Sequence, residues 1–238
     1  MSNEQKHILG LFETALSSLN SDIRRMGELA KANLANATRG LLERNVDLCN
    51  RCIADDEDVD TLEKSIDREG INIITKFSPM AKDLRRVITT MKVSTALERI
   101  SDHAVGLAKR ARHVLEQPAM AEIDGIQLIA ELAAEQLKDA VSAFCDGNLK
   151  LALQIQSRDE ALDQAYRKFH QQVIGIMEKE PTHVRNDVDL LFITRFLERI
   201  GDQSVNIAED AVYLLTAYDI RHGGELPPVS ATGLVPKV

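Results

Sequence analysis

The segment Leu-Glu-Arg-Ile-Ser-Asp at residues 97–102 returns as Leu-Glu-Arg-Ile-Gly-Asp at residues 197–202, an offset of 100 positions. Further upstream the chain matches itself at an offset of 103 positions, as at Glu28 and Glu131. Self-similarity at a fixed spacing is the signature of a duplicated structural unit. The sequence therefore predicts two tandem copies of one unit, with a three-residue deletion between the two halves of a copy.

The composition favours helices. Of the 238 residues 44% are hydrophobic and 28% charged, but only 4% are aromatic, there is no Trp, and there are six prolines. Proline is excluded from helix interiors, and aromatic residues are enriched in strands. Asn45 and Asn148 stand at breaks in the periodic pattern and are expected to act as N-caps. Ser78-Pro79 has the pattern of an N-cap followed by Pro at the first helical position, and Glu180-Pro181 marks the equivalent break.

We expect an all-α fold of two tandem three-helix bundles. The helices are expected at residues 4–43, 46–76, 79–116, 121–146, 149–179 and 182–217. Short connections between long helices imply antiparallel neighbours. The first bundle is expected to span 1–117 and the second 118–219, and residues 220–238, rich in Gly and Pro, are expected to be a disordered tail.

The repeated motif places carboxylates on an apolar helix face. Glu98 and Asp102 lie four residues apart in line with apolar side chains, and Glu198 and Asp202 repeat this placement. An uncompensated carboxylate in such a position is costly, so it requires cations, water or a raised pKa.

A second acidic pair lies on the preceding helix of each copy. Asp56 and Asp60, and likewise Asp159 and Asp163, fall on one helix face. Both acidic pairs of a copy lie about 20 residues from the turn that joins their helices, so antiparallel packing brings them level. Each bundle is therefore expected to gather four carboxylates at one height.

Oxygen-only clusters favour Mg²⁺, Ca²⁺, Mn²⁺ or iron over a structural zinc site, and bridging carboxylates allow a multinuclear centre. The alternative is a hydrated acidic patch neutralised by Arg99, Arg199 or nearby lysines. One acidic pair would favour that alternative. Because the pairs are duplicated and level, we favour bound cations.

Other signals are weaker. The net charge of −8 argues against a broad nucleic-acid surface. There is no nucleophile elbow, P-loop or dinucleotide fingerprint, and the acidic pairs lack the His ligands of ferritin-like di-iron oxidases. Cys49 and Cys52 form a lone C-x-x-C that is better interpreted as reduced, partly buried thiols. A basic stripe is expected on the helix at 79–116, either as a solvated face or as a contact for an acidic partner or lipid head groups. It consists of Arg85, Lys92, Arg99 and Arg110.

The N-terminal residues are polar, and no uninterrupted run of about 18 apolar residues occurs. We therefore expect a cytoplasmic protein.

In the duplicated motif, in residues 80–86 (Met-Ala-Lys-Asp-Leu-Arg-Arg) and in residues 200–209 (Ile-Gly-Asp-Gln-Ser-Val-Asn-Ile-Ala-Glu), the chain resembles the PhoU family of phosphate-uptake regulators. The resemblance covers nearly the whole chain. It implies two three-helix bundles, metal clusters of iron, manganese, magnesium or zinc on the paired acidic motifs, and a homodimer.

The resemblance also implies a regulatory role and no enzyme activity. Such a protein acts negatively on the phosphate regulon, as an adaptor between the ATPase of the phosphate-specific ABC transporter and the sensor histidine kinase, in the cytoplasm at the inner face of the membrane. It contacts no nucleic acid and reaches the membrane through its partners. The first copy departs from the pattern at Ser101, Gly106 and Lys109, and a lysine near the cluster is expected to weaken metal binding there.

Two alternatives remain open from the residues alone. One is a carboxylate-bridged metal protein with storage or redox activity, and the other is a helical scaffold without any bound ion.

Overall fold

The computed structural model describes residues 3–118, 124–179, 182, 184–221 and 224. It contains six long helices in the described part of the chain: α1 (Asn3–Leu42), α2 (Val46–Phe77), α3 (Ala81–Leu115), α4 (Asp124–Asp146), α5 (Leu149–Lys179) and α6 (Val184–Thr216). The all-α prediction is confirmed, and the helix ends agree with the expected ones within three residues. The expected break at Glu180-Pro181 and most of the expected tail at 220–238 lie outside the described residues.

Side-chain caps fix two of the helix starts where the sequence predicted them. The Oδ1 atom of Asn45 accepts hydrogen bonds from the backbone N–H groups of Asp47 and Leu48 at the start of α2. The Oδ1 atom of Asn148 accepts one from Leu151 at the start of α5. Each Asn therefore satisfies backbone donors that have no partner within the helix.

The predicted N-cap at Ser78 is wrong. Ser78 ends α2 instead, in the left-handed conformation with φ 49°, and its backbone N–H donates to the carbonyl of Ile74. The right-handed helical conformation is disfavoured for a residue before proline, so Ser78 does not continue a helix into Pro79. Helix α3 begins only after Met80, which makes no side-chain cap hydrogen bond.

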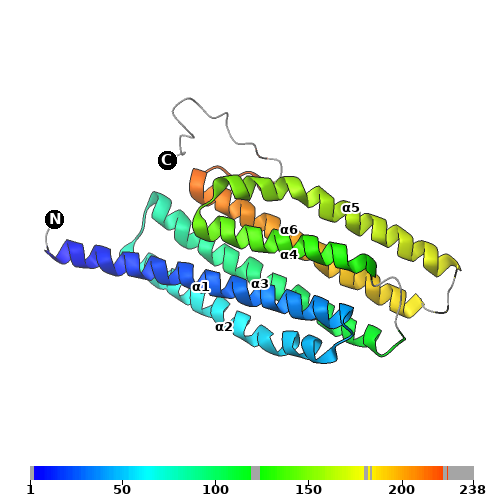
Figure 1. Cartoon of the computed structure of the whole chain (residues 1–238). Helices are drawn as coiled ribbons and strands as arrows, with labels where there is room; N and C mark the ends of the chain where they lie inside the picture. The colour runs from blue at the N-terminus through cyan, green and yellow to red at the C-terminus, as the bar shows by residue number, and fades with distance from the viewer. Residues whose placement is uncertain (1–2, 119–123, 180–181, 183, 222–223, 225–238) are drawn as a thin grey trace.

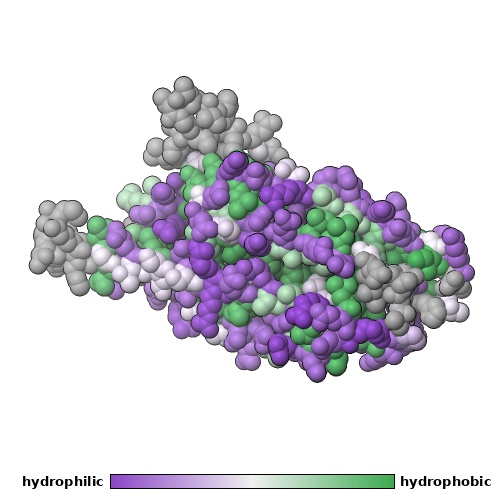
Figure 2. All heavy atoms as spheres, in the orientation of Figure 1, coloured by the Kyte–Doolittle hydropathy of each residue, from purple (hydrophilic) through white to green (hydrophobic). Residues whose placement is uncertain are grey.

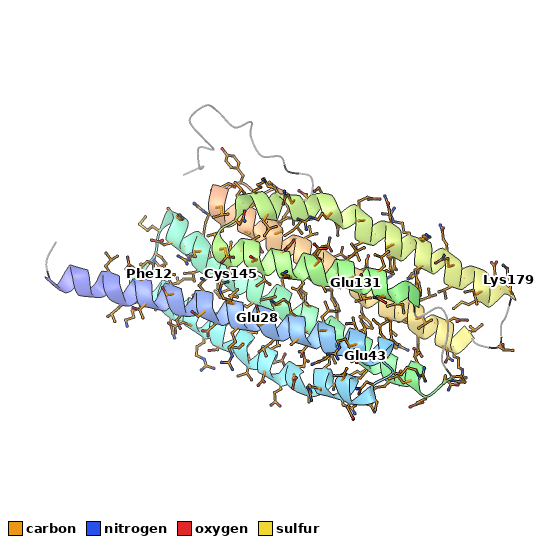
Figure 3. The ribbon with its side chains drawn as sticks, viewed as in Figure 1. Phe12, Glu28, Glu43, Glu131, Cys145 and Lys179 are labelled. Atoms are coloured by element: carbon orange, nitrogen blue, oxygen red, sulfur yellow. The ribbon has the colours of Figure 1, made fainter. Side chains whose placement is uncertain are left out.

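Each set of three helices packs as a bundle, in which every helix contacts the other two (Figure 1). Figure 3 labels Glu28 on α1 and Glu131 on α4, two positions that match at the offset of 103 and lie on equivalent helices. The buried side chains are mainly Leu, Ile, Val and Ala, among them Ile23, Leu97 and Leu197. On the face seen in Figure 2, hydrophobic residues are scattered among hydrophilic ones.

The two bundles join through α3 and α6, with a smaller contact between α1 and α4. Helices α3 and α6 run antiparallel, because Lys92 near one end of the interface meets Asp210 and Arg110 near the other end meets Asp189. Gly106 lets the helices approach closely: a Cβ atom added there would lie 2.6 Å from Cζ of Phe196. The contact therefore depends on a residue without a side chain.

Two members of the predicted basic stripe contact α6 at this interface while their side chains stay partly exposed. Nη1 of Arg110 donates to Oδ1 of Asp189 at 2.7 Å, and its guanidinium lies 4.5 Å from the ring centroid of Phe192. Nζ of Lys92 lies 3.6 Å from Oδ1 of Asp210 and 5.8 Å from the ring centroid of Tyr213. These cations bind the second bundle of their own chain.

Within the described residues, none of the helices combines the length and the apolar composition needed to cross a membrane.

Candidate functional site

The acidic cluster of the first bundle forms where α2 and α3 lie side by side. The pKa of Glu98 is raised to about 7, mainly by burial and also by the negative charges of Asp102, Glu63, Asp60 and Asp56. The four predicted carboxylates thus lie in one electrostatic neighbourhood, and Glu63 joins them. Glu63 was not among the predicted site residues, although its position seven residues after Asp56 places it on the same helix face.

Asp56 is half-buried in this cluster, and a hydrogen bond from α3 holds its carboxylate. Ser101 on α3 donates from its hydroxyl to Oδ1 of Asp56 at 2.7 Å. Burial raises the pKa of Asp56, with contributions from Asp102 and Asp60, while this hydrogen bond and the charge of Lys109 lower it. Lys109 therefore acts on the first cluster, as its position in the sequence suggested.

The second bundle repeats the arrangement between α5 and α6. The pKa of Asp202 is raised to about 6, mainly by partial desolvation and also by the charges of Glu198, Asp159 and Asp163, while Arg199 opposes the shift. Burial also raises the pKa of Glu198 and of Asp159. The four predicted carboxylates of this bundle are again electrostatic neighbours.

The surroundings of the second cluster differ from those of the first. Nη2 of Arg167 lies 2.8 Å from Oδ2 of Asp163, so one carboxylate already has a cationic partner. Tyr166 occupies the position that Glu63 holds in the first copy, and its ring lies 4.0 Å from that of His170. His170 is half-buried and forms a 3.1 Å hydrogen bond with the Thr194 hydroxyl. Its position is therefore set by Tyr166 on α5 and Thr194 on α6.

The donor set fits a hard cation, since each cluster supplies only carboxylate oxygens whose mutual repulsion a cation would relieve. Among the residues that the structure describes, however, no three His, Cys, Asp or Glu side chains are arranged as a group that holds a metal ion. A cation would therefore require the carboxylates to converge from their present positions.

The thiols of the C-x-x-C segment contribute to neither cluster. Cys49 and Cys52 are free and fully buried, and burial raises the pKa of Cys52 to about 12. A thiol that holds its proton so strongly is a poor nucleophile and a poor metal ligand at neutral pH.

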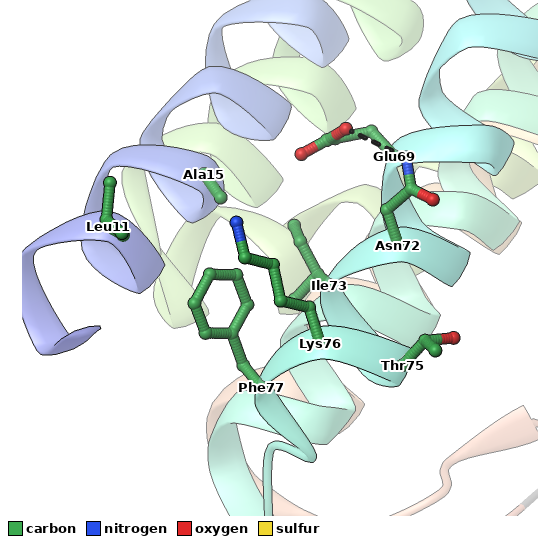
Figure 4. A pocket seen from close by; sticks show the side chains of 8 residues that line it. All are labelled: Leu11, Ala15, Glu69, Asn72, Ile73, Thr75, Lys76 and Phe77. Carbon is green, nitrogen blue, oxygen red and sulfur yellow. Dashed lines mark hydrogen bonds between the residues drawn. The ribbon is translucent and has the colours of Figure 1, made fainter.

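A surface pocket of about 390 Å³ lies between α1 and α2, at the end of α2 (Figure 4). Nζ of Lys76 lies 5.2 Å from the centroid of the Phe77 ring, and Asn72 donates to Glu69 at 3.4 Å. Leu11 closes the pocket from α1. None of the predicted site residues lines it.

Comparison with known proteins shows the family of this chain. The family model described as "PhoU domain" matches the chain twice, at residues 23–111 and 126–211. The chain belongs to the PhoU family. Each match covers one bundle of this PhoU-family chain and includes its complete acidic cluster.

Curated relatives extend over most of the PhoU-family chain. The "Phosphate-specific transport system accessory protein PhoU homolog" of Caulobacter vibrioides is 32% identical over 90% of this chain and 94% of its own length. The "Phosphate-specific transport system accessory protein PhoU" of Escherichia coli is 30% identical over 93% of this chain and 92% of its own length.

Solved structures show the same fold. The crystal structure of PhoU from Pseudomonas aeruginosa superposes with a TM-score of 0.84 at 28% identity, covering 86% of this chain and 98% of that one. The phosphate transport system regulatory protein PhoU from Streptococcus pneumoniae gives a TM-score of 0.80 at 27% identity, covering 87% and 98%.

Proposed function

We propose that this protein is an accessory regulator of phosphate-specific transport that keeps the phosphate regulon repressed when phosphate is plentiful. The observation that supports this most directly is the double match to the PhoU domain, together with relatives named as accessory proteins of the phosphate-specific transport system. The role is regulatory rather than catalytic. Its action is contact with other proteins in the cytoplasm, in a homodimer.

In finer detail, the protein is an adaptor between the ATPase of the phosphate ABC transporter and the sensor histidine kinase. The acidic clusters are its metal sites, with Asp56, Asp60, Glu98 and Asp102 in one bundle and Asp159, Asp163, Glu198 and Asp202 in the other. The raised pKa values of Glu98 and Asp202 support this assignment, because carboxylates that are partly desolvated and repel each other gain most from a bound cation.

The regulatory role is tested in a strain that lacks the gene, with a phosphatase reporter under a phosphate-regulated promoter. We expect the reporter to be active in high phosphate without the gene and repressed again when the wild-type gene is returned. Unchanged repression in the deletion strain would refute the regulatory role.

The adaptor and metal roles are tested with Glu198→Gln/Asp202→Asn in the same strain. We expect this variant to bind less metal, to recover less transporter ATPase and kinase on purification, and to leave the reporter active. The control is Glu57→Gln/Asp58→Asn, which removes the same charge from exposed positions on α2. Equal metal content and equal repression in the two variants would argue against metal-dependent docking.

A further inference from the structure

A buried amide on the first helix of the first bundle is linked to the acidic cluster. Nδ2 of Asn33 on α1 donates to the hydroxyl of Ser101 on α3 at 2.8 Å, and that hydroxyl donates to Oδ1 of Asp56 on α2 at 2.7 Å. Asn33 is 1% exposed and Ser101 is fully buried. The three helices of the bundle are thus joined by one chain of hydrogen bonds that ends on a carboxylate.

The second bundle makes the same connection without the hydroxyl. Gln136 on α4 is the counterpart of Asn33 at the offset of 103, and its Nε2 donates directly to Oδ1 of Asp159 at 3.2 Å. Gly201 is the counterpart of Ser101. The side chain of Gln136 is longer than that of Asn33 by one methylene group, so it reaches the carboxylate without a bridge.

A third buried position also differs between the two bundles. Val59 in the first copy corresponds to Leu162 in the second. A Cβ atom added to Gly201 would overlap Cδ2 of Leu162 and would lie 2.9 Å from Oε1 of Gln136. The space taken by the serine side chain in one bundle is therefore filled by a longer amide and a longer aliphatic side chain in the other. Such volume-conserving exchanges are the ones that a close-packed core accepts.

Packing alone does not explain the amides. Asn33 Oδ1 and Gln136 Oε1 are buried and have no hydrogen-bond partner in the described part of the protein. A buried acceptor without a partner is unfavourable, and an apolar side chain of similar size would avoid that cost. What both amides supply is an N–H donor, which is the group that a carboxylate or a carboxylate-bound hydroxyl requires.

We propose that Asn33 and Gln136 are the positioning residues of the two acidic clusters, and that each holds one carboxylate with an N–H donor. Asn33 acts on Asp56 through the hydroxyl of Ser101, and Gln136 acts directly on Asp159. One oxygen of the held carboxylate is thereby fixed and the other is left for a cation. Partners that orient a ligand in this way commonly change metal affinity about 10–100-fold when they are removed. For metal binding, the proposal rests on the metal role of the clusters.

The test uses full-length protein in the Glu198→Gln/Asp202→Asn background, so that Mn²⁺ binding reports on the first cluster. Ser101→Gly is expected to weaken Mn²⁺ binding about 10-fold or more and to change the spectrum of bound Mn²⁺ in electron paramagnetic resonance. The triple variant Asn33→Gln/Val59→Leu/Ser101→Gly, which installs the second-bundle set, is expected to restore both.

Ser94→Gly is the matched control. Ser94 is fully buried on the same helix, but its hydroxyl donates to the backbone carbonyl of Met91. We expect this variant to keep parental Mn²⁺ affinity even though it loses thermal stability as Ser101→Gly does. The proposal is overturned if Ser101→Gly binds like the parent, or if a folded triple variant binds no better than Ser101→Gly.

If the triple variant does not fold, the reciprocal set Gln136→Asn/Leu162→Val/Gly201→Ser is compared with Gly201→Ser in the second bundle, with the first cluster neutralised. If the parent binds no Mn²⁺, the metal role fails, and crystal structures of the metal-free variants decide the positioning role. An Asp56 side chain displaced in Ser101→Gly and returned in the triple variant supports it, and an unmoved Asp56 refutes it.

Discussion

Arg110 on α3 and Asp189 on α6 form a 2.7 Å ion pair between the two bundles, in which the carboxylate is almost completely buried. The guanidinium also packs on the ring of Phe192. Removal of Arg110 would leave Asp189 without its cation in a poorly hydrated place, so this pair stabilises the bundle contact more than an exposed pair does.

Arg110→Ala is therefore expected to lower the free energy of unfolding by about 1–3 kcal/mol in urea titrations. The control is Arg39→Ala, which breaks an exposed pair between Arg39 on α1 and Glu43 and is expected to leave the free energy of unfolding nearly unchanged. An equal loss of unfolding free energy in the two variants would mean that the pair between the bundles stabilises the protein no more than an exposed pair does.

Substitution by alanine at two helical glycines is expected to change the free energy of unfolding in opposite directions. Gly201→Ala places Cβ against Leu162 and Gln136 and should destabilise the protein by about 1–3 kcal/mol. Gly175→Ala meets no atom within 4 Å and should stabilise α5 by about 0.5–1 kcal/mol. Thermal unfolding of both variants beside wild type measures this, and a neutral Gly201→Ala would contradict the packing seen around that residue.

The stability of the metal-free protein should depend on pH through Glu98. Its pKa is about 7 in the folded protein and near 4.5 when unfolded, so the folded state binds the proton more tightly. The resulting stabilisation is complete below pH 4.5 and is lost as the pH rises to about 7. With a chelator in the buffer, the Tm of Glu98→Gln should therefore rise relative to the Tm of wild type as the pH is increased from 5 to 8. A constant difference would show that Glu98 is not so perturbed.

Asp202→Asn should have opposite effects with and without metal. At pH 7.5 the wild-type carboxylate is ionised above its pKa of about 6 and is repelled by Glu198, Asp159 and Asp163. The amide removes this repulsion, so the metal-free variant should have a higher Tm than wild type. With Mn²⁺ present the order should reverse, because the variant would lack one of the proposed ligands. Asp58→Asn, at an exposed position, should follow wild type in both conditions.

The repeat and the caps could be predicted because they are local or periodic in sequence. Asn45 was predicted correctly, since an N-cap depends on the backbone two and three residues ahead of it. Ser78 was not, because the pattern Ser-Pro suits both the end of one helix and the start of the next. The left-handed conformation of Ser78 decides between them.

Several contacts between residues far apart in the sequence could not be predicted. A helical wheel placed Lys92 and Arg110 on one face of α3 but could not reveal that α6 lies against part of that face. The sequence also marked Ser101 as a departure from Gly201. Its connection to Asn33, 68 residues away, needed the packed bundle.

Helices α3 and α6 are copies of one helix at an offset of 100 positions, and they pack antiparallel. Each residue pair across their contact therefore has a counterpart pair, in which each residue is replaced by its equivalent on the other helix. The counterpart of the Lys92–Asp210 ion pair is Phe192 with Arg110, and these two residues do meet, as a cation stacked on an aromatic ring. Two separate identical subunits would have to place the same pair at both positions. One covalently continuous chain is free of that restriction, so the two ends of the α3–α6 contact use different chemistry. An ion pair at 3.6 Å lies at the Lys92 end, and a guanidinium that is stacked on Phe192 and paired with Asp189 lies at the Arg110 end. We therefore expect the two ends to respond differently to ionic strength.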